Sequence, residues 1–472
     1  MNLTKRILAG ALAMATVLSC AACGKDGDEK TTTTAATLNS EDQAVIDEVV
    51  ENVGDQLPDV ELANKTVKWL AHYDINPTVE GAVMPPNLAL FESKYGGKVE
   101  WVQTNWESRY TDLANYVQSN TAPDLFPADD MDTHPKGAIK GMFQPIDDYI
   151  DLSSDIWADT KEACDKFMYQ GKHYVAVIDI SPNCICIYNK NTIEEHGYDD
   201  PAELYAEGKW DWNTFEEMCI DFTDPDNDMY ALDGWAVENG IMTTAGMPLI
   251  DIVDGTVVSN VMEPTIEKVQ TFMYDLQKNG VLYPRHLINN WSIRGGVDGT
   301  GLASGLQLFC PIGLWGIQNT PEKTEQFGNI AEGEVMFVPM PKDPDLDYYP
   351  IWSRVNGYNL ITGAQNPEGA AAYINCCRFS AGSEETNALG LKQLTEEYGW
   401  TEEMVAMKDE ITEAARQNPV FDFSASITDD IASRLDQLSR GTMIPGEKTW
   451  AELRGEQTDA IDYLVGEVNA GN

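Results

Sequence analysis

The most constraining feature of this sequence is an alternation of strand-like and helix-like segments between residues 66 and 127. The segment "TVKWLAH" has strand character, and "NLALFESKYG" follows with the apolar spacing of a helix that ends at Gly96 and Gly97. A second strand, "KVEWVQ", leads to the helical segment "NWESRYTDLANYVQSN", which stops before Pro123 and a third strand. This order predicts an α/β fold with a parallel, doubly wound sheet.

The ends of the three predicted strands are candidate ligand contacts, because ligands of such sheets bind outside the carboxyl ends of the strands. Tyr73 and Asp74 follow the first strand, Trp106 follows the second, and Asp129 and Asp130 follow the third. An alternative interpretation is that Trp106 folds onto the surface and that the acids are ordinary surface carboxylates.

Length and charge set the broad class of protein. The 472 residues are 43% hydrophobic and exceed what one hydrophobic core supports, so we expect two lobes. Asp and Glu number 77 against 31 Lys and Arg, which gives a formal net charge of −46. A surface this acidic repels nucleic acid and anionic lipid, so we expect neither as a partner.

The N-terminus has the pattern of a secretory signal peptide, residues 1–22. Lys5 and Arg6 precede the apolar run "ILAGALAMATVLS", which is shorter than the roughly 20 residues of a membrane-spanning helix. The following "AACG" resembles the lipobox of bacterial lipoproteins, which implies lipidation of Cys23 by acyl chains such as palmitate. Cys20, in "VLSC", is the alternative lipidation site, and cleavage without lipidation is a further one. The sequence thus predicts a lipid-anchored protein on the extracellular face of the membrane of a Gram-positive-type bacterium.

The rest of the chain predicts a spacer and two discontinuous lobes. Residues 23–62 are polar and acidic and read as a flexible spacer in which "QAVIDEVVENV" forms a short helix. The segment "GEVMFVPMPKDPDLDYYPIWSRVNGYNLIT" has strand character and is expected to return to the first lobe. The predicted N-lobe is 63–177 plus 335–365, and the predicted C-lobe is 182–334 plus 366–472. The hinges are expected near 177–182, 335 and 365.

Several segments, in order, resemble the extracellular solute-binding proteins of family 1, the lipoprotein receptors of bacterial carbohydrate ABC transporters. The segments that carry the resemblance are "APDLF", "GMFQPIDDYI", "GKHYVAV", "ICIYNKNTIEEHGYDDP", "WDWNTFEEMC", "LFCPIGLWGI", "VMFVPMPKD" and "NGYNLIT…NPEGAAAYI". The resemblance runs from about Lys65 to the C-terminus. It implies a two-lobed, type II periplasmic-binding-protein-like fold with a multi-strand hinge, in which a sugar is captured between the lobes and delivered to ABC transporter permease subunits.

The resemblance also implies binding residues. Trp315 in "GLWGI" matches a family position for a Trp that stacks on sugar, and its alternative is a core Trp beside Gly313 and Gly316. Asp179 follows the hinge strand where family members keep a carboxylate for a sugar hydroxyl, and its alternative is a solvated loop acid.

Two further sets of residues are candidates from their own pattern. Trp352, Arg354 and Asn356 take alternate positions in "IWSRVNGYN", so one face of a strand would present all three to ligand or to solvent. Trp235 and Glu238 in "GWAVENG" form an aromatic and acid pair of low specificity.

One acidic segment, "DPDNDMYALD", is a candidate metal-binding loop. Asp224, Asp226 and Asp228 have the spacing that begins a calcium loop. Met229 stands where that loop needs Gly, and Trp235 occupies the twelfth place, where it needs Glu. A plain turn is the favoured interpretation, calcium is a weak alternative, and we expect no other cofactor.

The sequence favours a binding protein over an enzyme. It contains no G-x-S-x-G, H-E-x-x-H or P-loop motif, and no pair of carboxylates stands out as the acid and base of a glycosidase. We expect a monomer that binds a saccharide, with several Trp candidates favouring an oligosaccharide. The alternatives are a surface glycan-binding lipoprotein without transport and an ABC receptor for a non-sugar solute.

Beyond the N-terminal region an odd number of cysteines remains, without the spacing of a metal site. Their number suggests free thiols in the core and a reducing or anaerobic habitat. Cys184 and Cys186 lie at strand spacing and are expected to be buried as small hydrophobic residues.

Overall fold

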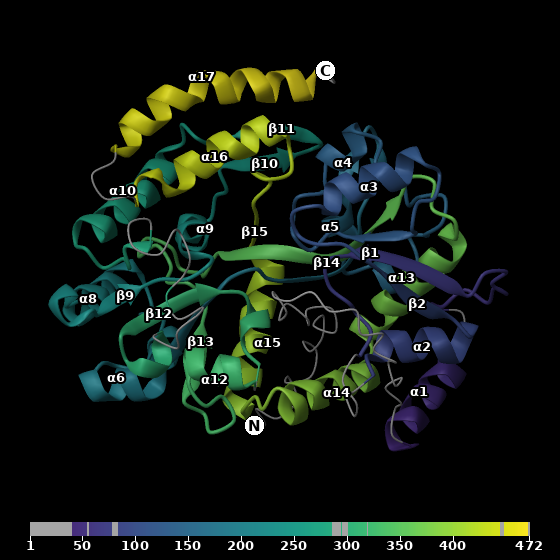
Figure 1. Ribbon diagram of the computed structural model, residues 1–472, viewed down its shortest axis with the longest axis horizontal. Coiled ribbons are helices and arrows are strands. Elements are labelled where there is room, and N and C mark those ends of the chain that lie inside the picture. The colour runs from purple at the N-terminus through teal and green to yellow at the C-terminus, as the bar shows by residue number, and fades with distance from the viewer. Residues whose placement is uncertain are drawn as a thin grey trace, which may run out of the picture. The chain divides into compact units, whose positions relative to one another are not determined.

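The computed structural model describes residues 40–53, 56–77, 84–285, 294, 301–318, 320–443 and 448–470. The chain divides into two compact units, and the predicted α/β class is confirmed (Figure 1). Unit 1 comprises residues 1–180 and 355–397, and unit 2 comprises 181–354 and 398–472.

The sheet of unit 1 is built on three parallel strands. β1 (Thr66–Ala71) pairs in parallel with β2 (Lys98–Gln103) on one side and with β3 (Leu125–Pro127) on the other. The predicted strand, helix and strand order is confirmed for these elements. β14 (Ile351–Ile361) runs antiparallel to β3 and also pairs with β4 (Phe143–Gln144). The carboxyl ends of β1, β2 and β3 therefore meet at one edge of this sheet.

Helices pack on this sheet through apolar faces. The core beside β1 and β3 combines residues of strands, of α3 (Arg109–Gln118) and of the loop after α3: Leu70, Leu113, Ala122, Phe126, Phe143 and Ile361. α2 (Pro86–Tyr95) ends at Gly96, whose φ of 63° is the left-handed conformation that glycine adopts without strain. The remaining helices and short strands of unit 1 are α4 (Lys136–Ile139), η2 (Asp155–Trp157), α5 (Lys161–Asp165), β5 (Met168–Tyr169), β6 (Lys172–His173), α13 (Pro367–Gly382), α14 (Glu384–Lys392) and η7 (Gln393–Glu397).

The first described helix corrects the predicted spacer. α1 (Ser40–Asn52) packs on α2 and α14, as Figure 1 shows for α1 and α2. Its buried Ile46 joins Ala89 and Leu389 in a small core, and Asp42 pairs with Lys392. The prediction of a flexible spacer over 23–62 is therefore wrong for this helix, because its apolar residues recur at helical spacing and find a partner surface.

The sheet of unit 2 has the order β13 (Val335–Val338), β8 (Ile185–Asn189), β12 (Gln307–Ile312) and β9 (Tyr230–Leu232). β8 is antiparallel to both of its neighbours, and β9 is parallel to β12. β8 and β12 are buried along their whole length, as expected of strands covered on both faces.

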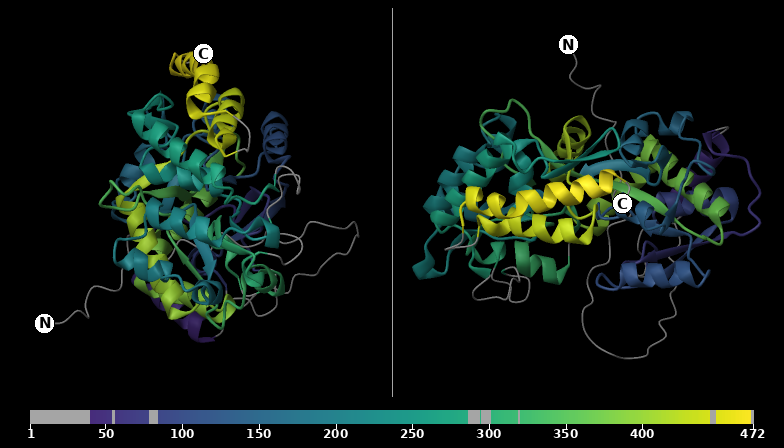
Figure 2. Two further views of the ribbon diagram at one scale, coloured as in Figure 1. Left: turned by 90° about the vertical axis from the view of Figure 1, so that its left-hand side faces the viewer. Right: turned by 90° about the horizontal axis from the view of Figure 1, so that it is seen from above.

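Helices, one antiparallel strand pair and the short strand β15 (Pro419–Phe421), which pairs with β14, complete unit 2. Among them, the long C-terminal α17 (Trp450–Asn469) packs on α16 (Asp429–Gly441), and Figure 2 shows the two side by side. The remaining elements are α6 (Lys190–His196), α7 (Pro201–Ala206), α8 (Trp212–Phe222), η3 (Pro225–Asn227), α9 (Val237–Met242), η4 (Thr243–Ala245), β10 (Ile250–Val253), β11 (Thr256–Ser259), α10 (Pro264–Lys278), η5 (Leu302–Ser304), η6 (Leu314–Gly316), α12 (Pro321–Phe327) and α15 (Glu402–Gln417).

The chain passes between the units three times, twice inside strands and once after η7. The first passage lies between Ile180 and Ser181 in β7 (Ala176–Pro182), within the range predicted for the first hinge. The second lies between Arg354 and Val355 in β14, and the last follows Glu397. These positions differ from the predicted hinges near 335 and 365.

Strand pairing explains the first difference, and helix packing explains the second. β13 pairs with β8 from Val335 to Val338, so residues 335–354 belong to unit 2 and not to the N-lobe. α13 packs on α2 and β1, so residues 366–397 belong to unit 1 and not to the C-lobe. Both predictions failed because the partner strand or helix lies far away in the sequence.

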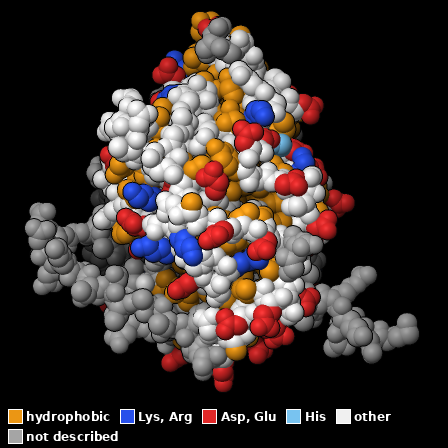
Figure 3. All heavy atoms as spheres, turned by 90° about the vertical axis from the view of Figure 1, so that its right-hand side faces the viewer, with side chains coloured by type: hydrophobic (Ala, Val, Ile, Leu, Met, Phe, Trp, Pro, Cys, Tyr) orange, Lys and Arg blue, Asp and Glu red, His pale blue; other side chains and the backbone are white. Residues whose placement is uncertain are grey.

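Acidic side chains are spread over the molecular face in Figure 3, among apolar and basic ones. The charge excess seen in the composition is thus present on a folded surface. None of the helices in the described ranges is long and apolar enough to cross a bilayer.

Candidate functional site

The first candidate site is the carboxyl edge of the unit 1 sheet, which we call edge 1: residues 72–74, 104–106 and 128–130. These segments directly follow β1, β2 and β3, which are parallel neighbours. The structure therefore brings the predicted Tyr73, Asp74, Trp106, Asp129 and Asp130 to one edge, as expected for open α/β sheets.

Trp106 is the prominent aromatic residue of edge 1. Its side chain is 49% exposed, which is high for a Trp. The guanidinium carbon of Arg109 lies 3.5 Å from the centroid of its ring, and the ring of His72 meets it edge-on at 5.1 Å. The indole is thus held by neighbours and still open to solvent.

Buried polar groups also lie at edge 1. The Tyr73 hydroxyl donates to Oδ2 of Asp129 at 3.1 Å, and both side chains are buried. Asp74 and Asp130 are half-buried. Burial lowers the pKa of His72, and the nearby Asp129 opposes this without cancelling it. His72 is therefore neutral at neutral pH, which leaves edge 1 with an excess of carboxylates.

The second candidate site is the corresponding edge of unit 2, which we call edge 2: residues 233–235 and 313–315. β9 and β12 are parallel, and these segments follow their carboxyl ends. Trp235 is 59% exposed. Trp315 is half-buried, and its indole covers Gly313, where an added Cβ would lie 2.4 Å from Nε1 of the ring. Two of the predicted tryptophans therefore share this edge.

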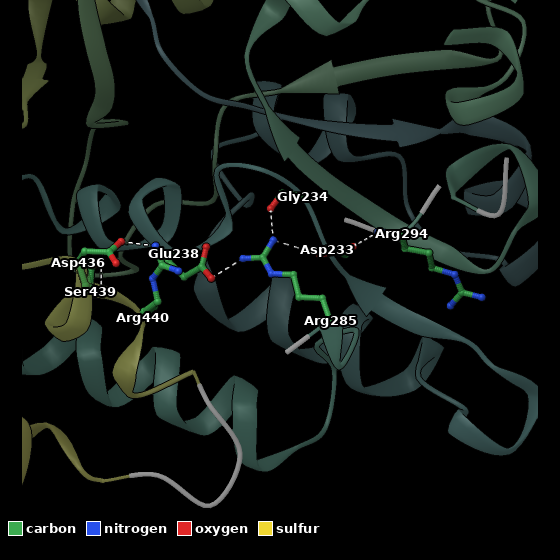
Figure 4. A network of polar contacts seen from close by, with 8 residues as sticks. All are labelled: Asp233, Gly234, Glu238, Arg285, Arg294, Asp436, Ser439 and Arg440. Atoms are coloured by element: carbon green, nitrogen blue, oxygen red, sulfur yellow. Dashed lines mark hydrogen bonds and ion pairs between the residues drawn. The ribbon is translucent and has the colours of Figure 1, made fainter. Parts of the chain in front are cut away.

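A network of charged groups supports edge 2 (Figure 4). Nη1 of Arg285 donates to the carbonyl of Gly234 at 2.7 Å and to Oδ1 of Asp233 at 3.4 Å, and Nη2 donates to the carboxylate of Glu238. The backbone N–H of Arg294 donates to the other oxygen of Asp233. Burial raises the pKa of Asp233 to about 6, although these donors and the charge of Arg285 act in the opposite direction.

The network changes the interpretation of Glu238. It was predicted to pair with Trp235 as a ligand contact. In the structure its carboxylate binds Arg285, which also holds the turn before Trp235. Glu238 thus holds Arg285, which in turn holds the turn before Trp235.

The candidates on the two crossing strands are less exposed. Asp179 in β7 is 4% exposed. Trp352 and Arg354 are half-buried in β14 and alternate with buried Ile351 and Ser353, while Asn356 is 5% exposed. The chain division assigns Trp352 and Arg354 to unit 2 and Asn356 to unit 1.

The acidic segment of the calcium hypothesis forms a turn. Asp224 accepts a hydrogen bond from Nδ2 of Asn227, and Asp228 adopts φ of 59°. Both the carboxylate and the carbonyl of Asp228 accept hydrogen bonds from Arg294. Among the described residues no group of three or more acidic, Cys or His side chains is arranged to hold a metal ion, so Asp224, Asp226 and Asp228 do not form such a cluster.

The predicted lipidation residues Cys23 and Cys20 lie outside the described residues. The cysteines that the structure describes are all free and buried, including Cys184 and Cys186. Burial raises the pKa of Cys164 and Cys310 to about 12, so these thiols are neutral and unreactive.

The sequence-based predictions missed the arginines that support both edges. Arg109 stands three residues after Trp106 at the start of a helix, and this spacing is a signal that the sequence contained. Arg285 has no such signal, because Asp233 and Glu238 lie about fifty residues away in the chain.

Comparison with known proteins defines the class. Residues 88–390, well over half of the chain, match the family described as bacterial extracellular solute-binding protein. The chain belongs to this family, as predicted, and the family's extracellular character agrees with the predicted location. No match was found among curated proteins.

Solved structures agree on the fold. The ABC substrate-binding protein of Listeria monocytogenes in complex with cycloalternan has a TM-score of 0.60 at 16% identity, over 85% of this chain and 98% of that one. The galacto-N-biose-/lacto-N-biose I-binding protein of Bifidobacterium longum has a TM-score of 0.60 at 15% identity, over 86% and 98%. The cyclic alpha-maltosyl-1,6-maltose binding protein of Arthrobacter globiformis has 0.59 at 15%, over 85% and 98%. The predicted two-lobed binding-protein fold is confirmed.

Proposed function

We propose that this protein captures an oligosaccharide outside the cell and delivers it to the permease subunits of an ABC transporter. The observation that carries the proposal is the exposed indole of Trp106, held by Arg109, at the same sheet edge as Asp74, Asp129 and Asp130. The sugars in the solved structures of similar fold support it.

The chemistry of edge 1 suits a sugar. A pyranose ring has apolar C–H faces that stack on an indole, and its hydroxyl groups donate to carboxylates. Asp74, Asp129 and Asp130 supply such acceptors at the same edge as Trp106. In unit 2, edge 2 presents Trp235 and Trp315, and these aromatic rings suit the apolar face of a sugar in the same way.

The proposal also covers the membrane anchor and the absence of a chemical reaction on the ligand. We propose a monomer anchored to the extracellular face of the membrane through lipid on Cys23, with Cys20 as the alternative. The ligand is bound and released unchanged, without a cofactor. The closure of two lobes around the ligand stays a prediction.

A thermal-shift screen of the purified protein tests this function. The panel contains mono- and oligosaccharides, polyols and short peptides, each with and without calcium. A ligand that binds only the folded state raises the melting temperature. We expect a selective rise with one oligosaccharide series and no release of reducing ends.

Each other outcome of the screen has a meaning. A rise with polyols or peptides alone would replace the sugar by another solute. New reducing ends would make the protein a hydrolase. If binding is found but deletion of the gene leaves uptake of that sugar unchanged, the protein is a surface glycan-binding lipoprotein.

A further inference from the structure

Arg109 is a buried charge that needs an explanation. It is the first residue of α3 and is 6% exposed. Burying a guanidinium is costly unless its donors are paired, so its partners show where this cost is offset.

The partners of Arg109 converge on Trp106. Nη1 donates to the carbonyl of Trp106, and the guanidinium plane covers the indole at 3.5 Å from its centroid. Nη2 donates to Oδ2 of Asp132 at 2.6 Å, and Asp132 also accepts a hydrogen bond from the Tyr110 hydroxyl. One side chain therefore fixes both the backbone and the ring of Trp106, and Asp132 fixes that side chain in turn.

The surrounding loop is fixed as well. The hydroxyls of Thr104 and Ser108 donate to Oδ2 of Asp112, at 2.5 and 2.8 Å. Oδ1 of Asn105 accepts the backbone N–H of Ser108 at 2.8 Å. The exposed indole is thus attached to a rigid base, and the ring itself is the part that the Arg109 guanidinium orients.

We propose that Arg109 is a positioning residue that orders the Trp106 indole before ligand arrives. This inference rests on the proposed function, in which Trp106 stacks on a sugar. An exposed side chain that is ordered only on binding loses conformational freedom at that moment and weakens affinity. A guanidinium that holds the ring beforehand removes this cost, and Arg109 does so without contacting the ligand.

A double-mutant cycle measures this role. Calorimetry gives the affinity for the best oligosaccharide of the screen in four proteins: the natural chain, Arg109→Lys, Trp106→Ala and the double variant. Lys keeps the charge but loses the planar stacking. We expect Arg109→Lys to weaken binding about five- to tenfold when Trp106 is present and less than about twofold when Trp106 is Ala. Equal losses in both backgrounds, or no loss with Trp106 present, would overturn the proposal.

A second measurement does not depend on any ligand. The protein is labelled with 5-fluorotryptophan, and the Trp106 resonance is assigned by its absence in Trp106→Phe. We expect one sharp ¹⁹F resonance in the natural chain and a broadened or split one in Arg109→Lys. Asp132→Asn, which loosens Arg109, should show the same change.

The control is Arg434→Lys, a half-buried arginine of α16 whose Nη1 donates to Gln457 and which lies at neither edge. It should leave both affinity and the Trp106 resonance unchanged. If no compound of the screen binds, the proposed function fails, and an unaltered Trp106 resonance in Arg109→Lys would separately refute the positioning role.

Discussion

Arginines organise both units at the level of single residues, two of them buried (Arg109 and Arg378) and one half-buried (Arg285). Arg109 holds Trp106, Arg285 holds the turn before Trp235, and Arg378 in α13 donates to the carbonyls of Ile156 and Ile178. Each also has a carboxylate partner. A planar guanidinium with several donors is suited to joining segments in this way.

A substitution of Trp315 tests whether this residue contacts the ligand or belongs to the core. We expect Trp315→Ala to weaken oligosaccharide binding by about 1 kcal/mol or more, because stacking on the sugar is lost, while the fold is kept. Calorimetry with the sugar found in the screen measures this. Tyr463→Ala, an exposed aromatic residue of α17, is the control and should bind normally. Normal binding by Trp315→Ala would assign this residue to the core.

The burial of His134 makes the free energy of unfolding depend on pH. It is packed between Phe167 and Tyr174, and burial lowers its pKa from 6.5 to about 3. Between these values the unfolded chain binds a proton that the folded chain does not, so stability falls as pH falls below 6.5. From pH 6.5 to pH 5 this group removes about 2 kcal/mol.

The test is urea unfolding of the natural chain and His134→Gln at pH 7 and pH 5. We expect the loss of stability on acidification to be smaller in the variant by about 2 kcal/mol. His196→Gln is the control for a histidine whose side chain is exposed. An unchanged loss in His134→Gln would mean that other groups determine the acid sensitivity.

At the scale of elements, α1 belongs to the folded body. Ile46 is fully buried against Ala89 and Leu389. We expect Ile46→Ala to lower the free energy of unfolding by about 2 to 4 kcal/mol, because it leaves a cavity between helices. Chemical denaturation measures this, with exposed Glu48→Ala in the same helix as the control. Equal stability of the two variants would mean that α1 is part of the flexible spacer and not of the folded body.

For the whole molecule, the decisive question is the anchor. We expect Cys23→Ser to move the protein from the membrane fraction to the medium, because two acyl chains give stable attachment and none remains. Fractionation and mass spectrometry of the N-terminal peptide measure this, with Cys20→Ser as the matched control. Release by Cys20→Ser with retention of Cys23→Ser would assign the lipid to Cys20.

Local pattern in the sequence determined the α/β class, the strands β1, β2 and β3, the glycine end of α2 and the gathering of candidates at edge 1. These follow from the spacing of apolar residues and from the direction of parallel strands, which one short segment already contains. The family resemblance identified Trp315 only as a candidate for stacking on sugar, and the structure places it after the end of β12.

Only the tertiary structure decided the assignments that depend on distant partners. β13 belongs to unit 2 because it pairs with β8, and α13 belongs to unit 1 because it packs on α2. Arg285 binds Asp233 and Glu238, which lie about fifty residues away in the chain. α1 became part of the fold because Leu389 lies opposite Ile46. A sequence presents each apolar stripe or charge alone, whereas its free energy depends on the surface that covers it.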